Sequence, residues 1–166
     1  MNNSIEAINQ MTQAEFVQRF GHIFEETPTV AKTAWTARPF TKLDDLHKKM
    51  VAVVHRMSPA EKLALIRAHP ELGAKAEMAD ASVQEQASAG LNRLNAKDYQ
   101  KIQTLNAAYK EKFGFPFVVA VKGMSVKDVI AAMETRVGSE REEEVARSLA
   151  EIYKIARFRL ENTIEC

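Results

Sequence analysis

The feature that most constrains this chain is its longest apolar run, which extends from Phe113 to Val121 and contains Gly114 and Pro116. Pro116 lacks a backbone N–H and disfavours helical geometry at the residue before it, and Gly114 permits a sharp helix end. We therefore predict an extended segment over 113–121. Its backbone polar groups need partners outside any helix, either neighbouring side chains or a polar ligand. The residues alone leave both alternatives open.

The rest of the chain carries the periodicity and start signals of helices. Ser58-Pro59-Ala60-Glu61 combines a cap, a proline at the first helical position and an acidic residue two positions later. Similar signals occur at Thr12, Ser82, Asn95 and Ser125. Other expected boundaries are a restart with Pro28 at a first helical position, a helix over 41–57, a loop over 71–81 and a last helix from about Glu140. We predict an all-α single domain over 1–166, with about eight helices and the one extended apolar segment.

The composition excludes several functional classes. The 166 residues include 23 Lys and Arg against 22 Asp and Glu, so the net charge of +1 provides no field for nucleic acid or an anionic membrane. No apolar stretch is long enough to span a membrane, and the first residues lack the pattern of a signal peptide. The single cysteine, Cys166, excludes an intramolecular disulfide and a cysteine-rich metal site. We expect a cytoplasmic protein without a metal centre.

One arginine of the last predicted helix occupies an unexpected position. On a helical projection, Arg159 falls within the apolar arc formed by Val145, Leu149, Ile152 and Ala156. A guanidinium keeps its proton in proteins, so its burial requires an anionic partner. That partner is either a protein carboxylate or the anionic group of a ligand, unless the side chain extends back to solvent.

Glu85 and Gln86 follow a possible helix cap at Ser82. Glu85 can close a capping box with the Ser82 amide, which alone would explain its position. The N-terminus of a helix also presents free N–H groups to polar or anionic ligands, and Gln86 adds an amide donor and acceptor. Both interpretations remain open.

His69 lies between the end of a predicted helix and Pro70. A single histidine at a helix end is usually structural. Its ordinary pKa near 6.5 nevertheless makes it the best candidate for proton transfer at neutral pH. The chain contains none of the common zinc-protease, phosphate-binding, serine-hydrolase or dinucleotide-binding motifs, so these residues do not define a reaction.

Four blocks that contain these residues resemble the OHCU decarboxylase family (2-oxo-4-hydroxy-4-carboxy-5-ureidoimidazoline decarboxylases) in order and spacing. The blocks are His69-Pro70-Glu71-Leu72-Gly73, Ser82-x-x-Glu85-Gln86 with Ala89-Gly90-Leu91, Phe113-Gly114-Phe115-Pro116-Phe117-Val118, and Glu151-Ile152-x-Lys154-Ile155-Ala156-x-x-Arg159-Leu160. The resemblance covers nearly the whole chain. It implies an all-α, cofactor-free and usually homodimeric enzyme that converts OHCU to (S)-allantoin in urate and purine breakdown.

The resemblance also implies roles for individual residues. His69, Glu85 and Arg159 match the catalytic residues, with Arg159 binding the substrate carboxylate. The substrate-binding positions match Pro70, Ser82, Val83, Gln84, Glu85, Gln86, Phe117, Val118, Val119, Ala120, Val121 and Arg159. Two alternatives from other classes are a non-enzymatic helical binding module for a small carboxylate or a partner protein, and a family member that has become an interaction domain. The binding module would share the buried Arg159 but would not require His69, and the presence of all three catalytic matches argues against the interaction domain.

Overall fold

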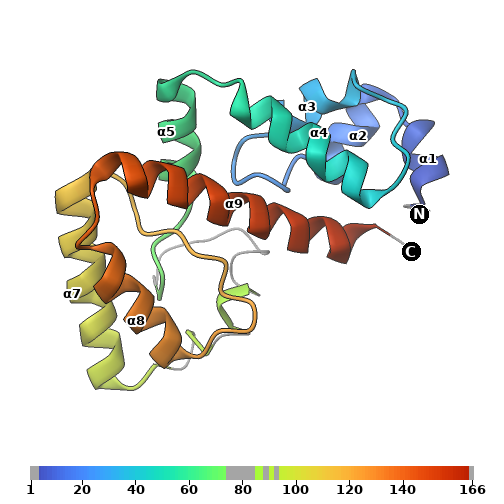
Figure 1. The fold of residues 1–166 in the computed structure, drawn as a ribbon. Helices are drawn as coiled ribbons and strands as arrows, with labels where there is room; N and C mark the ends of the chain where they lie inside the picture. The colour runs from blue at the N-terminus through green and yellow to red at the C-terminus, as the bar shows by residue number, and fades with distance from the viewer. Residues whose placement is uncertain (1–3, 74–84, 88–89, 92–93, 165–166) are drawn as a thin grey trace. The chain divides into compact units, whose positions relative to one another are not determined.

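The protein is all-α in the computed structural model, which describes residues 4–73, 85–87, 90–91 and 94–164 (Figure 1). No β-strand occurs among these residues, and the predicted fold class is confirmed. The helices are α1 (Ile5–Asn9), α2 (Gln13–Phe20), α3 (Thr29–Trp35), α4 (Leu43–His55), α5 (Pro59–Ala68), α7 (Ala96–Phe113), α8 (Val126–Arg136) and α9 (Arg141–Thr163). Within the described part of the chain, no helix combines the length and the apolar character that a membrane span requires.

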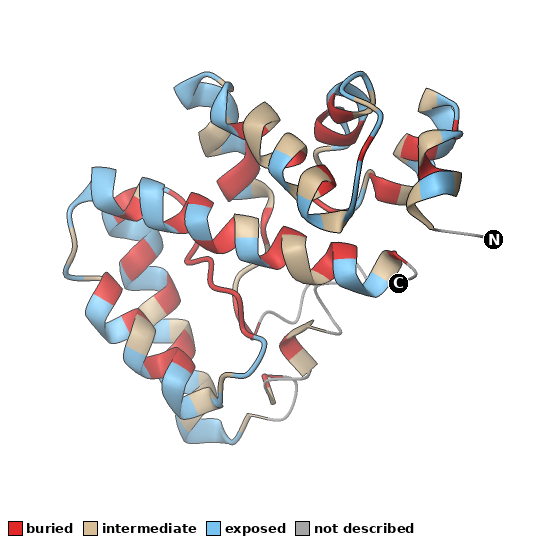
Figure 2. Ribbon diagram, turned by 45° about the vertical axis from the view of Figure 1, so that its right-hand side comes forward, coloured by how far each residue is buried: buried red, intermediate tan, exposed pale blue. Residues whose placement is uncertain are grey.

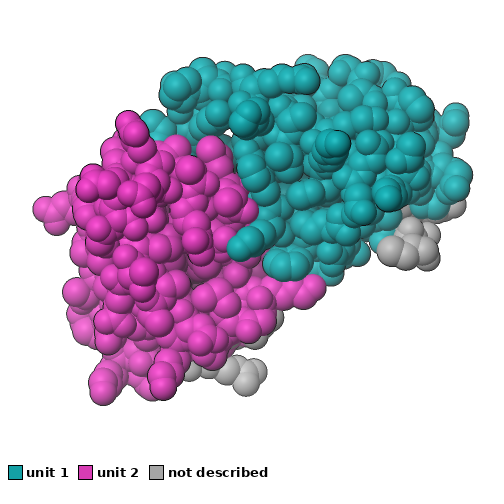
Figure 3. All heavy atoms as spheres, in the orientation of Figure 1, with its two compact units in different colours: residues 1–68, 153–166 teal, residues 69–152 magenta. Residues whose placement is uncertain are grey.

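The chain packs as two compact units (Figure 3). Unit 1 consists of Met1–Ala68 and Tyr153–Cys166, and unit 2 consists of His69–Ile152. Helix α9 is shared, because its first part belongs to unit 2 and its last part to unit 1.

Reciprocal side-chain caps define several helix starts, as the sequence predicted. Thr12 and Ser125 form capping boxes with Glu15 and Asp128 at the starts of α2 and α8. At α5, the Ser58 amide donates to Glu61, and the Glu61 amide donates to the Ser58 hydroxyl. These bonds satisfy N–H groups that have no partner inside a helix.

Some predicted boundaries were wrong by one or two residues. Pro28 is the residue before α3 and not its first residue, because the helix begins at Thr29. Helix α4 is shorter at both ends than the predicted 41–57. Phe113 is the last residue of α7, so the extended segment begins after it. The predicted loop over 71–81 and the predicted cap at Ser82 fall mostly outside the described residues.

The core of unit 1 lies between α2, α3 and α4. Phe16 and Phe20 of α2 are buried together with Phe40. The ring centroid of Phe16 lies 4.9 Å from that of Phe20 and 5.8 Å from that of Phe40. Trp35, at the end of α3, donates from its indole nitrogen to the Met11 carbonyl at 2.9 Å. The hydrophobic stripe of α2 therefore packs on its neighbours as its periodicity predicts.

In unit 2, α7 and α8 are joined by the extended segment, which is buried along its length (Figure 2). Gly114 ends α7 in the left-handed conformation, with φ of 81°, and its amide donates to the Lys110 carbonyl. Tyr109, Phe113, Phe115 and Phe117 then form a cluster with ring centroids 4.6–5.9 Å apart. The glycine reverses the chain so that aromatic residues on both sides of it share one core.

Candidate active site

His69 directly follows the last residue of α5. That helix ends at Ala68, and Pro70 cannot continue it because the residue before a proline avoids helical geometry. His69 is buried, with 7% of its surface exposed. An imidazole at this position has little contact with bulk water, which suits a group that transfers a proton to a bound substrate.

The turn that follows His69 is held by two amide side chains. Gln86 Oε1 accepts from the Gly73 amide at 2.9 Å, and Gln86 Nε2 donates to the Glu71 carbonyl at 3.5 Å. Asn106 Nδ2, from α7, donates to the Leu72 carbonyl at 3.0 Å. Gln86 was expected to contact substrate, and these contacts show that it also shapes the turn at 71–73.

Glu85 is half-buried, and the described residues 85–87 are helical. The cap proposed for it involves Ser82, which lies outside the described residues together with Val83 and Gln84. The choice between a capping and a ligand-binding Glu85 therefore stays a prediction.

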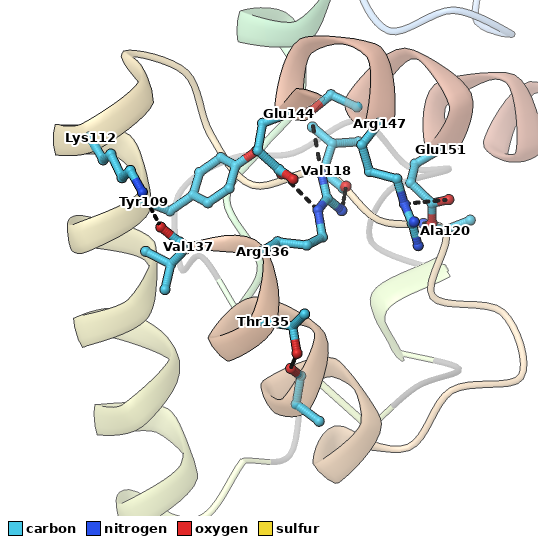
Figure 4. Close-up of polar contacts among 12 residues, drawn as sticks. Tyr109, Lys112, Val118, Ala120, Thr135, Arg136, Val137, Glu144, Arg147 and Glu151 are labelled. Carbon is cyan, nitrogen blue, oxygen red and sulfur yellow. Dashed lines mark hydrogen bonds and ion pairs between the residues drawn. The ribbon is translucent and has the colours of Figure 1, made fainter. Parts of the chain in front are cut away.

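The extended segment has two of its backbone groups bound by charged side chains (Figure 4). Arg136 Nη1 donates to the Val118 carbonyl at 2.7 Å, and the Ala120 amide donates to Glu151 Oε1 at 3.2 Å. The sequence left open whether side chains or a ligand satisfy this backbone. For these two groups the partners are side chains.

Phe117 and Val119 differ in this respect from Val118 and Ala120. Both are buried, with 1% and 7% of their surface exposed. Among the described residues, their backbone N–H and C=O groups have no hydrogen-bond partner. Buried backbone groups are nearly always paired, so a polar ligand is a candidate partner for these two residues. The backbone of buried Phe115, earlier in the segment, likewise has no partner among the described residues.

A buried polar cluster beside the segment was missed at the sequence level. Arg136 is 5% exposed and donates from Nε to Glu144 Oε1 at 2.8 Å and from Nη2 to the Ser148 hydroxyl at 3.4 Å. The Tyr109 hydroxyl donates to the same Glu144 oxygen at 2.6 Å, and the guanidinium lies 4.4 Å from the centroid of the Phe117 ring. Burial, and then the hydrogen bond to Glu144, raise the pKa of Tyr109 above its usual range.

A sequence signal for this cluster did exist. Arg136 follows Val129 and Met133 at helical spacing and therefore continues the buried stripe of α8. Glu144, Ser148 and Glu151 recur at the same kind of spacing along α9. Polar residues in register with an apolar stripe are the pattern that identified Arg159, and it applies equally to these residues.

Arg159 is buried, as predicted, and lies in unit 1. Its Nη2 is 2.9 Å from Glu25 Oε2, and its Nη1 donates to the His22 carbonyl at 3.0 Å. The side chains of Arg159 and Glu25 are each 3% exposed. Of the two anionic partners considered from the sequence, the protein carboxylate is thus present. The other predicted site residues, His69, Glu85, Gln86 and 117–121, all belong to unit 2.

The OHCU decarboxylase family model matches residues 9–161. The chain belongs to this family. It is 45% identical over 158 residues to the OHCU decarboxylase of Halalkalicoccus jeotgali, a match that covers 95% of this chain and 90% of that protein. It is 42% identical over 161 residues to the uric acid degradation bifunctional protein of Bacillus subtilis, of which it covers 33%.

Two solved structures resemble this chain in fold. The crystal structure of (S)-allantoin synthase superimposes with a TM-score of 0.79 at 26% identity, over 97% of this chain and 54% of that one. An OHCU decarboxylase crystallised in the presence of (S)-allantoin superimposes with a TM-score of 0.69 at 23% identity, over 81% of this chain and 89% of that one. The second match supports the fold.

Proposed function

We propose that this protein catalyses the decarboxylation of OHCU to (S)-allantoin, as a carboxy-lyase of urate degradation. The family match over 9–161 supports the reaction. At the site, the observation that carries the proposal is that Phe117 and Val119 are buried while their backbone groups have no partner among the described residues. OHCU carries ring amide and ureido groups, which supply the donors and acceptors that such a backbone requires.

The substrate supplies its own electron sink. Loss of CO2 breaks the bond between C4 and the carboxylate, and its electron pair forms a C4=C5 double bond. The electrons of the adjacent C5=N bond move to nitrogen, which accepts a proton. The C4 hydroxyl then loses its proton to form the carbonyl, and a proton added to C5 sets the stereocentre. We therefore expect catalysis without a metal or an organic cofactor.

The side chains receive roles from the resemblance and from their chemistry. We assign His69 to proton transfer at the C4 hydroxyl or carboxylate. Arg159 binds the carboxylate through charge-assisted hydrogen bonds, which also fix its orientation. Glu85 and Gln86 bind the ureido group, and the 117–121 backbone binds the ring amide. Pro70 and Ser82 to Gln84 complete the proposed contacts.

Three broader features are also part of the proposal. We expect a homodimer, because the family is usually dimeric. We expect a cytoplasmic location, and we expect no nucleic-acid or membrane partner because the net charge of +1 attracts neither. Size-exclusion chromatography with light scattering tests the dimer directly.

The first experiment follows circular dichroism of allantoin during the decay of freshly generated OHCU. The wild-type protein should produce an (S)-allantoin signal faster than spontaneous decay, which yields racemic product. His69→Ala should lower turnover by roughly 10²–10⁴-fold without changing the helical far-ultraviolet spectrum. A folded His69→Ala variant with wild-type turnover would show that His69 does not transfer a proton in the reaction. A wild-type protein that binds a small carboxylate but leaves OHCU decay unchanged would instead support a binding module.

A further inference from the structure

We infer that Arg136 and Glu151 are positioning residues that fix the register of the 117–121 segment, so that the backbone groups of Phe117 and Val119 are presented to substrate. This inference rests on the proposed function and extends it to residues that lie outside the predicted substrate-binding set.

The contacts on the segment alternate along the chain. Val118 and Ala120 are bound through their backbone by Arg136 and Glu151, whereas Phe117 and Val119 have no backbone partner among the described residues. Successive residues of an extended chain direct their backbone groups to opposite sides, so residues two apart share a side. The side that carries Val118 and Ala120 is therefore held by the protein through one group of each residue, and the groups assigned to substrate, those of Phe117 and Val119, lie on the other side.

The far end of the segment is also fixed. The Val121 carbonyl accepts from the Met124 amide at 2.9 Å in the turn that leads to α8. With Gly114 ending α7 at the other side, the chain between the two helices has a defined length and defined attachment points. A shift by one residue would exchange the bound and unbound groups, and the bonds to Arg136 and Glu151 oppose that shift.

The two side chains are themselves held in place. The three guanidinium nitrogens of Arg136 contact Glu144, Val118 and Ser148, and its face lies on the Phe117 ring. Glu151 directs Oε1 to the Ala120 amide, while its Oε2 lies 3.8 Å from Nε of Arg147. The side chain of Glu151 is 4% exposed, and that of Arg147 is 57% exposed. Buried and locked side chains can hold a backbone in one geometry.

Glu151 offers a clean test, because each of its oxygens contacts a different group. Glu151→Gln keeps an amide oxygen for the Ala120 N–H but removes the charge that faces Arg147. Glu151→Ala removes the contacts of both oxygens, including those to Ala120 and Arg147, and Arg147→Ala removes the exposed ion pair but leaves the Ala120 bond. The readouts are KM and kcat for OHCU, amide hydrogen exchange at Ala120 and far-ultraviolet circular dichroism.

Glu151→Ala should raise KM roughly tenfold with a smaller change in kcat, because the segment binds substrate in both the ground and transition states. Its Ala120 amide should exchange about tenfold faster than in the wild type. Glu151→Gln and Arg147→Ala should remain close to wild type in both readouts. If Gln behaves like Ala, or if Arg147→Ala reproduces the loss, the ion pair is the important contact and the inference is wrong.

Arg136→Lys provides a second, independent test. Lysine keeps the charge but cannot contact Glu144, Val118 and Ser148 together, so KM should again rise while the fold survives. A folded Arg136→Lys protein with wild-type KM would overturn the inference for Arg136. If wild-type protein does not accelerate OHCU decay, the proposed function fails, and the exchange data alone decide whether these side chains hold the segment.

Discussion

Arg136 in unit 2 and Arg159 in unit 1 have closely similar surroundings. Each is buried, each contacts one buried carboxylate and each donates to one backbone carbonyl. A buried guanidinium requires such partners wherever it lies in a protein. The similarity teaches that burial beside a carboxylate does not by itself distinguish an arginine that binds substrate from one that supports the fold.

The two arginines differ in what they hold. Arg136 contacts Glu144 and Val118, which are 8 and 18 residues away, and so fixes the chain between consecutive helices. Arg159 contacts the His22 carbonyl, which is 137 residues away, and so joins the two ends of the chain within unit 1. The first stabilises a segment proposed to bind substrate, and the second is proposed to bind substrate directly.

The largest effect should appear when the buried pair of Arg159 and Glu25 is removed as a unit. Arg159→Met combined with Glu25→Leu leaves no unpaired buried charge, so the protein should fold with a melting temperature near that of the wild type. Turnover should nevertheless fall by roughly 10²–10³-fold, because the substrate carboxylate loses its cation. Thermal melting and OHCU turnover measure the two effects. A folded double variant with normal turnover would reduce Arg159 to a structural ion pair.

The next effect concerns stability at Arg136. Arg136→Met leaves Glu144 buried without its cation, and the free energy of unfolding should fall by about 3–5 kcal/mol. Combining this change with Glu144→Leu and Tyr109→Phe should recover part of the loss, because no unpaired charge is then buried, although the Val118 carbonyl and the Ser148 hydroxyl still lose Arg136. Urea denaturation measures each value. If Arg136→Met and the wild type have the same free energy of unfolding, the polar cluster does not contribute to stability.

A smaller loss of stability is expected for Tyr109 than for Arg136. Tyr109→Phe removes one hydrogen bond to a carboxylate and should lower the free energy of unfolding by about 1.5–3 kcal/mol. It should also change the response to alkaline pH. The pKa of Tyr109 is raised in the folded protein, so the unfolded chain loses this proton first as pH rises above 10.

The wild type should therefore lose stability above pH 10 through this group, and Tyr109→Phe should lack that component. Denaturant unfolding from pH 8 to 11 provides the comparison. Parallel curves for the two proteins would show that Tyr109 titrates normally.

The smallest effect is expected at Arg157, a surface arginine of α9 two positions from Arg159. It pairs with Asp44 and Glu161, and both carboxylates are well exposed. Arg157 holds the pKa of Asp44 below its usual range, so the contribution of this pair is present at neutral pH and lost in acid. Exposed pairs contribute little, and Arg157→Ala should leave thermal melting and turnover unchanged within error. A loss of turnover as large as that expected for the Arg159 variant would show that the exposed Arg157 is also needed for activity.

The sequence predicted much of the fold because its signals are local. The caps at Thr12, Ser58 and Ser125 act over three residues, and Gly114 and Pro116 sit where the extended segment forms. The burial of Arg159 was predictable from helical spacing, but its partner Glu25 was not, because no periodicity links residues so far apart in the chain.

The site was less predictable than the fold. Arg136 and Glu151 lie in the buried stripes of their helices, yet a charged residue between apolar ones is easily assigned to the surface. Gln86 has a structural role that only the structure reveals, because its amide binds the 71–73 turn. The catalytic roles of His69 and Glu85 stay predictions, since burial and position do not specify a proton transfer.

The single tryptophan gives the two units different optical signatures. Trp35 is bonded to Met11 and covered by the Arg38 guanidinium at 3.8 Å, all within unit 1. Its fluorescence therefore reports on unit 1, whereas the difference in near-ultraviolet dichroism between the wild type and Tyr109→Phe reports on the unit 2 core, where Tyr109 packs against three phenylalanines. Following both signals through denaturation distinguishes cooperative melting, with coincident midpoints, from stepwise melting, with separate ones.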